Sequence, residues 1–172
     1  MKAFPDGSTV KRYDLSSKQG EGWATIVLGS DGFFAADSDF GGYAYSWPWN
    51  EPGDFREMFL SFDSDYILRK IARTEYDGEA TAKAIRKRIC ELRRSGDLSR
   101  ADARDEWELL KAAGDVYSEH DYVRWYEETV LELDSEFTRE RYPVHAERFV
   151  NEIIPRLREM LRAELAAEKQ AA

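Results

Sequence analysis

The sequence has few of the residues on which metal and redox chemistry depends. Its 172 residues include one cysteine, Cys90, and two histidines, His120 and His145. A single cysteine excludes an internal disulfide and a cysteine-based zinc site within one chain. Neither histidine belongs to a metal-binding helix motif, so we expect both at the surface or at helix starts. We predict no metal and no cofactor, and we expect Cys90 to be a packed thiol.

A long hydrophobic run is also missing. No stretch approaches the roughly 18 apolar residues of a membrane helix, and the first seven residues contain no apolar signal core. We therefore expect a soluble cytoplasmic protein with no membrane partner. Gly-rich phosphate loops and a Ser/His/Asp arrangement are lacking as well, and their absence argues against nucleotide-dependent enzymes and hydrolases. We predict that the protein is not an enzyme.

Charge, in contrast, is abundant and unevenly distributed. The formal net charge is −9, and residues 102–140, with thirteen acidic and four basic residues, themselves sum to −9. Residues 83–100 have the opposite sign, with seven basic and two acidic residues. Because phosphate neutralisation dominates affinity for nucleic acid, we expect so acidic a chain not to bind nucleic acid directly.

Large aromatic residues are concentrated in one short segment. Tyr43, Tyr45, Trp47 and Trp49 alternate with small residues or proline. In an extended strand this alternation directs four rings to one face. The rings could form core beneath helices, or an exposed platform that stacks bases or a planar ligand. The acidic charge favours core, with Trp49, which follows a proline, as the ring expected at the surface.

Strand patterns occupy residues 1–50, and helical patterns occupy residues 51–172. Alternating or β-branched segments separated by short turns predict an antiparallel meander of about four strands. Strands followed by helices predict one α+β domain over 1–172, in which this sheet packs with a C-terminal set of five to six helices. Capping residues predict helix starts at Asp54, Asp63, Ser99 and Ser118.

The last predicted helix covers roughly residues 144–169 and contains Pro155. Proline removes a backbone donor, so we expect a kink or a restart there. The apolar stripe from Val150 to Leu165 is either core or a surface through which the chain forms a homodimer, as a structural or assembly protein would. We expect the residues after Leu165 to fray.

The acidic window allows two interpretations. Its carboxylates could be paired locally with the basic helix before it, or they could form a negatively charged surface that docks on a basic protein. Local pairing accounts less well for residues 127–140, which have few bases nearby. The residues that we expect to contact a partner are Glu127, Glu128, Glu132, Asp134, Glu136 and Trp49.

Scattered acids provide a rival interpretation as an enzyme. Asp37, Asp39 and Asp63 could assemble an acidic site that no motif reveals, although Asp is also an ordinary turn and helix-start residue. Convergence of these carboxylates in a cleft would favour an enzyme.

Three motifs carry a resemblance to a known class of proteins. They are Ser38-Asp39-Phe40-Gly41-x-Tyr43-x-Tyr45-x-Trp47, Asp54-Phe55-x-x-x-Phe59-Leu60 and Asp65-Tyr66-x-x-x-Lys70-Ile71. The segment that they cover, about residues 30–73, resembles small accessory proteins of tailed phages and prophages. The resemblance implies a role such as countering host defences, as anti-CRISPR proteins do, and a bacterial nucleic-acid-binding complex as the partner. It carries over no catalytic residue.

Overall fold

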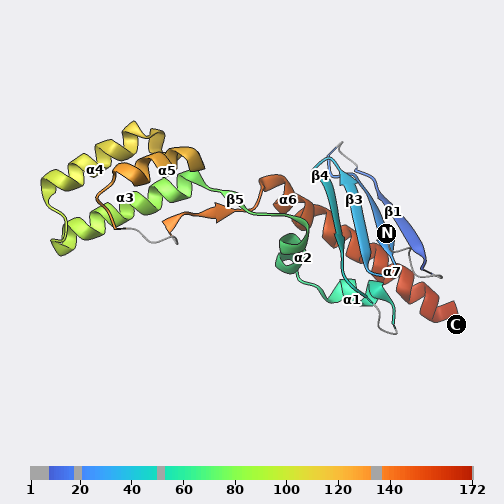
Figure 1. Ribbon diagram of the computed structural model, residues 1–172. Coiled ribbons are helices and arrows are strands. Elements are labelled where there is room, and N and C mark those ends of the chain that lie inside the picture. The colour runs from blue at the N-terminus through green and yellow to red at the C-terminus, as the bar shows by residue number, and fades with distance from the viewer. Residues whose placement is uncertain (1–7, 18–20, 50–52, 133–136, 172) are drawn as a thin grey trace. The chain divides into compact units, whose positions relative to one another are not determined.

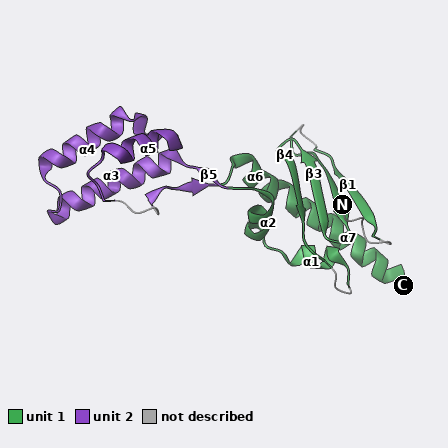
Figure 2. Ribbon diagram, viewed as in Figure 1, with its two compact units in different colours: residues 1–73, 142–172 green, residues 74–141 purple. Residues whose placement is uncertain are grey.

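The computed structural model describes residues 8–17, 21–49, 53–132 and 137–171 (Figure 1). Its contacts divide the chain into two compact units: unit 1, residues 1–73 and 142–172, and unit 2, residues 74–141 (Figure 2). The predicted α+β class, with an N-terminal sheet and helices after it, is confirmed. Whether the two units behave as the single domain expected over 1–172 stays a prediction.

Unit 1 contains the predicted four-stranded meander. Each strand pairs antiparallel with the next, in the order β1-β2-β3-β4, so that Ile26 lies opposite Ala36 and Ala36 lies opposite Tyr43. Turns of a few residues connect β2 to β3 and β3 to β4, as short hairpin connections require. The strands are β1 (Val10–Leu15), β2 (Ala24–Gly29), β3 (Phe33–Ser38) and β4 (Gly41–Ser46).

The turn between β2 and β3 depends on Gly32. Its φ is +91°, and a Cβ atom there would lie 1.9 Å from the carbonyl oxygen of Trp47. The same close approach lets the amide of Trp47 donate to the carbonyl of Gly32 at 3.0 Å. Only glycine fits this position, because other residues would meet both the strained φ and the backbone of the neighbouring strand.

The helices that precede and follow unit 2 in the sequence belong to unit 1. Asp54 and Asp63 cap the first two as predicted, by accepting from the amides of Arg56 and Tyr66. The predicted C-terminal helix changes to π-helical geometry over Phe149–Ile153, just before Pro155, while the backbone stays helical at both junctions, so a kink or restart at Pro155 stays a prediction. The elements are α1 (Phe55–Ser61), α2 (Ser64–Ile71), α6 (Val144–Arg148), η3 (Phe149–Ile153) and α7 (Ile154–Ala171).

Aromatic rings and the C-terminal stripe form the core of unit 1. Tyr43 and Trp47 are buried, while Tyr45 and Trp49 pack against the same cluster and are half-buried. The aromatic strand is therefore mostly core, as the acidic composition suggested. Buried residues of the other elements in this core include Phe34, Phe55, Phe59, Phe149, Val150, Ile153, Ile154, Leu157 and Leu161.

Unit 2 is a small helical body whose first and last strands pair with each other. Its helices begin at the capping residues Asp77, Ser99 and Ser118, and Ser118 forms a reciprocal capping box with Asp121. Trp125 is buried in a core with isoleucines and leucines of the other helices. The elements are β5 (Glu75–Tyr76), α3 (Gly78–Ser95), α4 (Arg100–Ala112), η1 (Gly114–Val116), α5 (Glu119–Glu128) and β6 (Glu140–Arg141). Across the described residues, no helix combines the length and apolarity needed to cross a bilayer.

Candidate functional site

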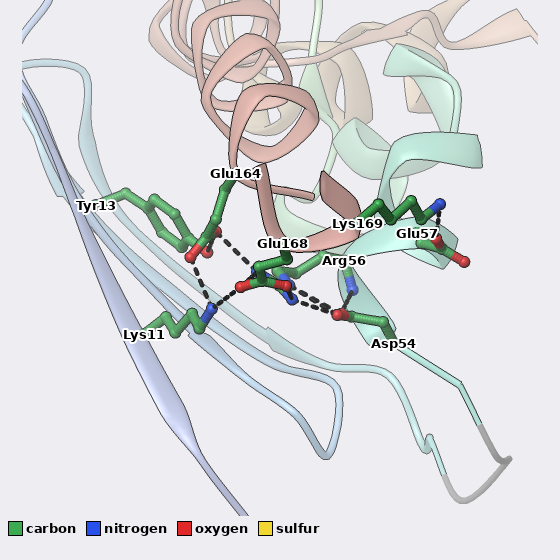
Figure 3. Close-up of polar contacts among 8 residues, drawn as sticks. All are labelled: Lys11, Tyr13, Asp54, Arg56, Glu57, Glu164, Glu168 and Lys169. Carbon is green, nitrogen blue, oxygen red and sulfur yellow. Dashed lines mark hydrogen bonds and ion pairs between the residues drawn. The ribbon is translucent and has the colours of Figure 1, made fainter. Parts of the chain in front are cut away.

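A dense group of charged side chains in unit 1 joins three segments that are far apart in the sequence. Lys11 Nζ lies 2.7 Å from Glu164 Oε1 and 2.9 Å from Glu168 Oε1. Arg56 Nη1 lies 2.9 Å from Glu164 Oε2, and its Nη2 lies 2.5 Å from Glu168 Oε2. Figure 3 shows that the group comprises Lys11 and Tyr13 of β1, Asp54 and Arg56 at the start of α1, and Glu164 and Glu168 of α7.

Mutual pairing holds these groups in their charged forms. Hydrogen bonds from Arg56 and Lys11 lower the pKa of Glu168 to about 2. Burial acts to raise the pKa of Glu164, but hydrogen bonds from its two cationic neighbours and from Tyr13 outweigh burial and lower that pKa. The Arg56 side chain is only 11% exposed. A set of opposite charges that satisfy one another connects β1, α1 and α7 and leaves no carboxyl poised to exchange protons near neutral pH.

The sequence analysis missed this group, because Glu164 and Glu168 lie more than a hundred residues from Lys11 and Arg56. A signal was nevertheless present: Glu164 and Glu168 are like charges four residues apart on one helix, an arrangement that needs cations nearby. The structure also corrects the expectation that the chain frays after Leu165. Helix α7 continues to Ala171, and Lys169 Nζ lies 2.8 Å from Glu57 Oε1 of α1 (Figure 3).

The predicted contact residues of the acidic window lie at and beyond the end of α5. Glu127 and Glu128 are its last two residues, and Glu132 follows in an extended segment. All three side chains are exposed, and none takes part in an ion pair within the described part of the chain. Asp134 and Glu136 lie outside the described residues.

Large apolar side chains are exposed in the same stretch of unit 2. In α5 Trp125 faces the core, Tyr126 stacks on Tyr122 while remaining half-exposed, and the helix ends before Val130. The exposed fractions are 83% for Tyr117, 49% for Val123, 47% for Tyr126 and 69% for Val130.

Helical geometry brings acidic and apolar residues of α5 together. Glu119, Val123 and Glu127 are spaced by four residues, and Tyr126 is three residues after Val123, so all four share one side of the helix. The opposite side carries Trp125 into the core. We call the exposed residues of this stretch the acidic surface: Tyr117, Glu119, Val123, Tyr126, Glu127, Glu128, Val130 and Glu132. Within it, Glu128 lies on the other side of α5 from Val123 and Tyr126, and Glu132 lines a hollow together with Lys87, Arg88 and Arg139.

A buried carboxylate fixes the chain that leaves α5. Glu106 of α4 is almost wholly buried, and its Oε2 accepts from Thr129 Oγ1 at 2.5 Å. Its Oε1 accepts from the amide of Val130 at 3.0 Å. These two bonds set the direction of residues 129–131, and therefore the position of Val130 and Glu132 in the acidic surface.

Trp49, the aromatic residue proposed for partner contact, lies in unit 1 and apart in sequence from the acidic surface. Its ring packs against Phe55, with ring centroids 6.2 Å apart, and it is half-buried rather than fully exposed. A contact role for Trp49 stays a prediction, and its packing on Phe55 gives it a structural role as well.

The scattered acids of the rival enzyme interpretation have local structural roles. Asp39 accepts from the amide of Gly22 at 2.5 Å, Asp63 caps α2, and Asp37 is exposed on β3. Among the described residues, no group of three or more His, Cys, Asp or Glu side chains is arranged to hold a metal ion.

The remaining predictions concern the sulfur and imidazole groups. His120 and His145 are exposed near the starts of α5 and α6, as predicted. The prediction for Cys90 was wrong, because this thiol is exposed on α3 and not packed. Its neighbour Ile89 takes the core-facing position of the helical period, which leaves Cys90 on the outer side.

Comparison with known proteins relates the chain to one protein family. A family model described as a phage family matches residues 4–163, which is most of the sequence. This match confirms the expected relationship to phage proteins at that level. Comparisons with curated proteins and with solved structures found no match.

Proposed function

The chain belongs to the phage family Phage_phiTE_072, and from this premise we propose that it is a non-enzymatic protein that binds another protein through the acidic surface. The partner carries a basic surface, as nucleic-acid-binding proteins do. The finer proposal is that the partner is a nucleic-acid-binding defence complex of the bacterial host, such as a CRISPR effector, which the protein inhibits in the host cytoplasm.

The observation that carries this proposal is the mixture of exposed acids and exposed apolar side chains in one stretch. Carboxylates such as Glu127 and Glu128 attract and orient a basic partner over distances of about 10 Å at moderate salt. Affinity needs apolar contacts in addition, and Tyr117, Val123 and Val130 expose such side chains. A surface whose only task is solubility gains nothing from exposed valines and tyrosines, whereas a docking surface needs both classes.

Proteins that bind nucleic acid carry basic surfaces, which are complementary in charge to the acidic surface. An acidic surface that occupies such a site competes with phosphate and blocks nucleic acid by occupation alone, without any chemical step. A phage protein that blocks in this way needs no catalytic residue, in agreement with the prediction that the chain is not an enzyme.

The alternative of an assembly protein that associates through the C-terminal stripe has less support. Val150, Leu157 and Leu161 are buried in the core of unit 1 and are not offered to a second chain. A homodimer through this helix would have to use the polar side of α7, which lacks a comparable apolar surface.

The test is affinity capture from a nuclease-treated bacterial lysate at graded salt concentrations. The wild type is compared with Glu127→Lys/Glu128→Lys and with a matched control, Asp105→Lys/Glu159→Lys. The control reverses two exposed acids outside the acidic surface and changes net charge equally. We expect the wild type and the control to retain a basic, nucleic-acid-binding partner, and the Glu127/Glu128 variant to lose it.

Retention of the same partner by the Glu127/Glu128 variant at low salt would contradict the proposal. The finer proposal has its own readout with the purified partner. Wild-type protein should release a labelled oligonucleotide from that partner in proportion to complex formation, and a partner that keeps its nucleic acid while bound would exclude inhibition by occupation.

A further inference from the structure

A groove between α3 and α4 of unit 2 is lined mainly by basic and apolar side chains, so its charge is opposite to that of the acidic surface. Its volume is about 500 Å³. Apolar side chains, including Ile89, Ala103 and Trp107, make up much of its lining. Its charged lining residues are Arg93, Arg94, Arg100, Arg104, Lys111 and Glu108.

Most of the positive charge in this groove is uncompensated. Lys111 Nζ lies 3.0 Å from Glu108 Oε1, so these two lining residues neutralise each other. The four arginines are exposed, and within the described part of the chain none of them forms an ion pair. An apolar lining surrounded by unpaired arginines matches a ligand that combines apolar side chains with carboxylates.

We propose that the acidic surface of a second copy of the chain occupies this groove. The acidic surface supplies the two complementary features on one side of α5, with Glu119 and Glu127 for the arginines and Val123 and Tyr126 for the apolar lining. Because groove and acidic surface are different parts of one chain, the contact is heterologous. Each molecule therefore has one groove and one acidic surface to offer, and copies add head to tail.

One observation favours a second copy over nucleic acid as the occupant. Trp107, the aromatic ring of the groove, already has the guanidinium of Arg86 over its ring at 5.9 Å, which leaves less of it for a base to stack on. A second copy supplies carboxylates and apolar side chains together.

This inference rests on the same acidic surface as the proposed function and adds a regulatory consequence to it. Self-association covers the acidic surface of every copy except one in each chain of molecules. A basic partner protein then competes with the groove for that surface, so that assembly and partner binding exclude each other.

The experiment uses sedimentation velocity of the full-length protein and two charge-reversal variants. Arg100→Glu/Arg104→Glu disables the groove, and Glu127→Lys/Glu128→Lys disables the acidic surface. We expect the wild-type weight-average mass to rise at least about twofold with concentration at low salt, and to fall back at about 0.5 M salt. Each variant alone should stay monomeric.

The mixture of the two variants provides the decisive measurement. Between them they retain one intact acidic surface and one intact groove, and the reversed groove and reversed surface are again complementary in charge, so the mixture should regain the association that each variant alone has lost. The matched control Arg69→Glu/Arg162→Glu reverses two exposed arginines of unit 1, outside both the groove and the acidic surface, and should associate like the wild type. A wild type that stays monomeric at all concentrations, or a mixture that does not dimerise, overturns the inference.

Partner capture separates this inference from the proposed function. The Arg100/Arg104 variant should capture the basic partner at least as well as the wild type, because its acidic surface is free. If the wild type is monomeric but still captures the partner through Glu127 and Glu128, the inference fails and the proposed function stands. Binding of a labelled single-stranded oligonucleotide that is lost in the Arg100/Arg104 variant would assign the groove to nucleic acid and overturn the inference.

Discussion

In unit 1 the oppositely charged side chains of distant segments form one dense group, whereas unit 2 has separate ion pairs such as Arg86–Asp115 and, in the α3–α4 groove, exposed arginines for which the described residues supply no ion-pair partner. Arg56 and Lys11 of unit 1 are within hydrogen-bonding distance of carboxylates more than a hundred residues away. In unit 2 the arginines of the α3–α4 groove and the glutamates of α5 remain apart. Paired charges fix a fold, while segregated charges are available to another molecule.

The same contrast holds for the large apolar residues. In unit 1 the rings of Phe34, Trp47 and Phe59 contact one another, with centroids 5.8 to 6.1 Å apart. In unit 2 Tyr117 and Val130 are among the most exposed large apolar residues that the structure describes. We interpret unit 1 as the scaffold and unit 2 as the binding part of the molecule.

The largest expected effect comes from the core of unit 1. Phe59→Ala removes a fully buried ring that stacks on Phe34, and should reduce the free energy of unfolding by about 3–5 kcal/mol. Urea denaturation checks this value. Phe62→Ala, at a half-buried ring of the same cluster, should cost clearly less, and equal losses would argue against a core centred on Phe59.

In unit 2 a sizeable effect on stability should come from Glu106, through hydrogen bonding. Glu106→Ala leaves Thr129 Oγ1 and the amide of Val130 without their acceptor, at a cost of about 2 kcal/mol. Partner binding should weaken as well, because the segment that carries Val130 loses its anchor. Asp105→Ala on the exposed side of the same helix, outside the groove, is the control and should leave both stability and binding nearly unchanged.

The ion-pair group of unit 1 should give stability a specific dependence on pH. Glu168 has a pKa of about 2 in the folded chain, below the value of about 4.3 for an unfolded glutamate. A carboxyl whose pKa is lowered by folding contributes stability in full above the unfolded value. That contribution is lost as the pH falls toward about 2.

Arg56→Met tests this pH dependence. At neutral pH the variant should be less stable by about 1.5 kcal/mol, since partly exposed carboxylates lose a cation that donates hydrogen bonds to them. The difference from the wild type should shrink as acid is added. A difference that stays constant from pH 7 to 3 would show that the guanidinium acts through packing alone.

The smallest effect on stability is expected at the exposed apolar residues of unit 2. Val123→Ser and Tyr117→Ser should each change the free energy of unfolding by less than about 0.5 kcal/mol. Capture of the partner should nevertheless drop, because these side chains supply apolar contact. Val10→Ser, at an exposed valine of unit 1, is the matched control and should affect neither property.

Local signals in the sequence predicted much of the fold. The meander followed from alternating strands and short turns, and the caps at Asp54, Asp63 and Ser118 act between residues two or three apart in the chain. Pro155 marked the place where the last helix changes its hydrogen-bonding pattern, because proline removes a backbone donor locally. Each of these features is determined by neighbours in sequence.

Features that depend on residues distant in sequence could not be predicted in this way. The contact of Arg56 with Glu168 depends on how α7 crosses the sheet, and the burial of Glu106 depends on the path of the chain after α5. The acidic surface was predicted in part: its glutamates stand out by charge, while the exposure of Val123 and Tyr126 depends on which side of α5 Trp125 takes into the core.

The pairing of β5 with β6 has a consequence for how such a molecule can change. Glu75 lies opposite Arg141, and Tyr76 lies opposite Glu140, so the segments that enter and leave residues 74–141 are neighbours. A module whose two ends are neighbours can be exchanged or shortened at one junction. The core contacts within unit 1 are then unchanged. Under the proposed function, a phage genome that follows a changing target can therefore replace unit 2 and keep unit 1 unchanged.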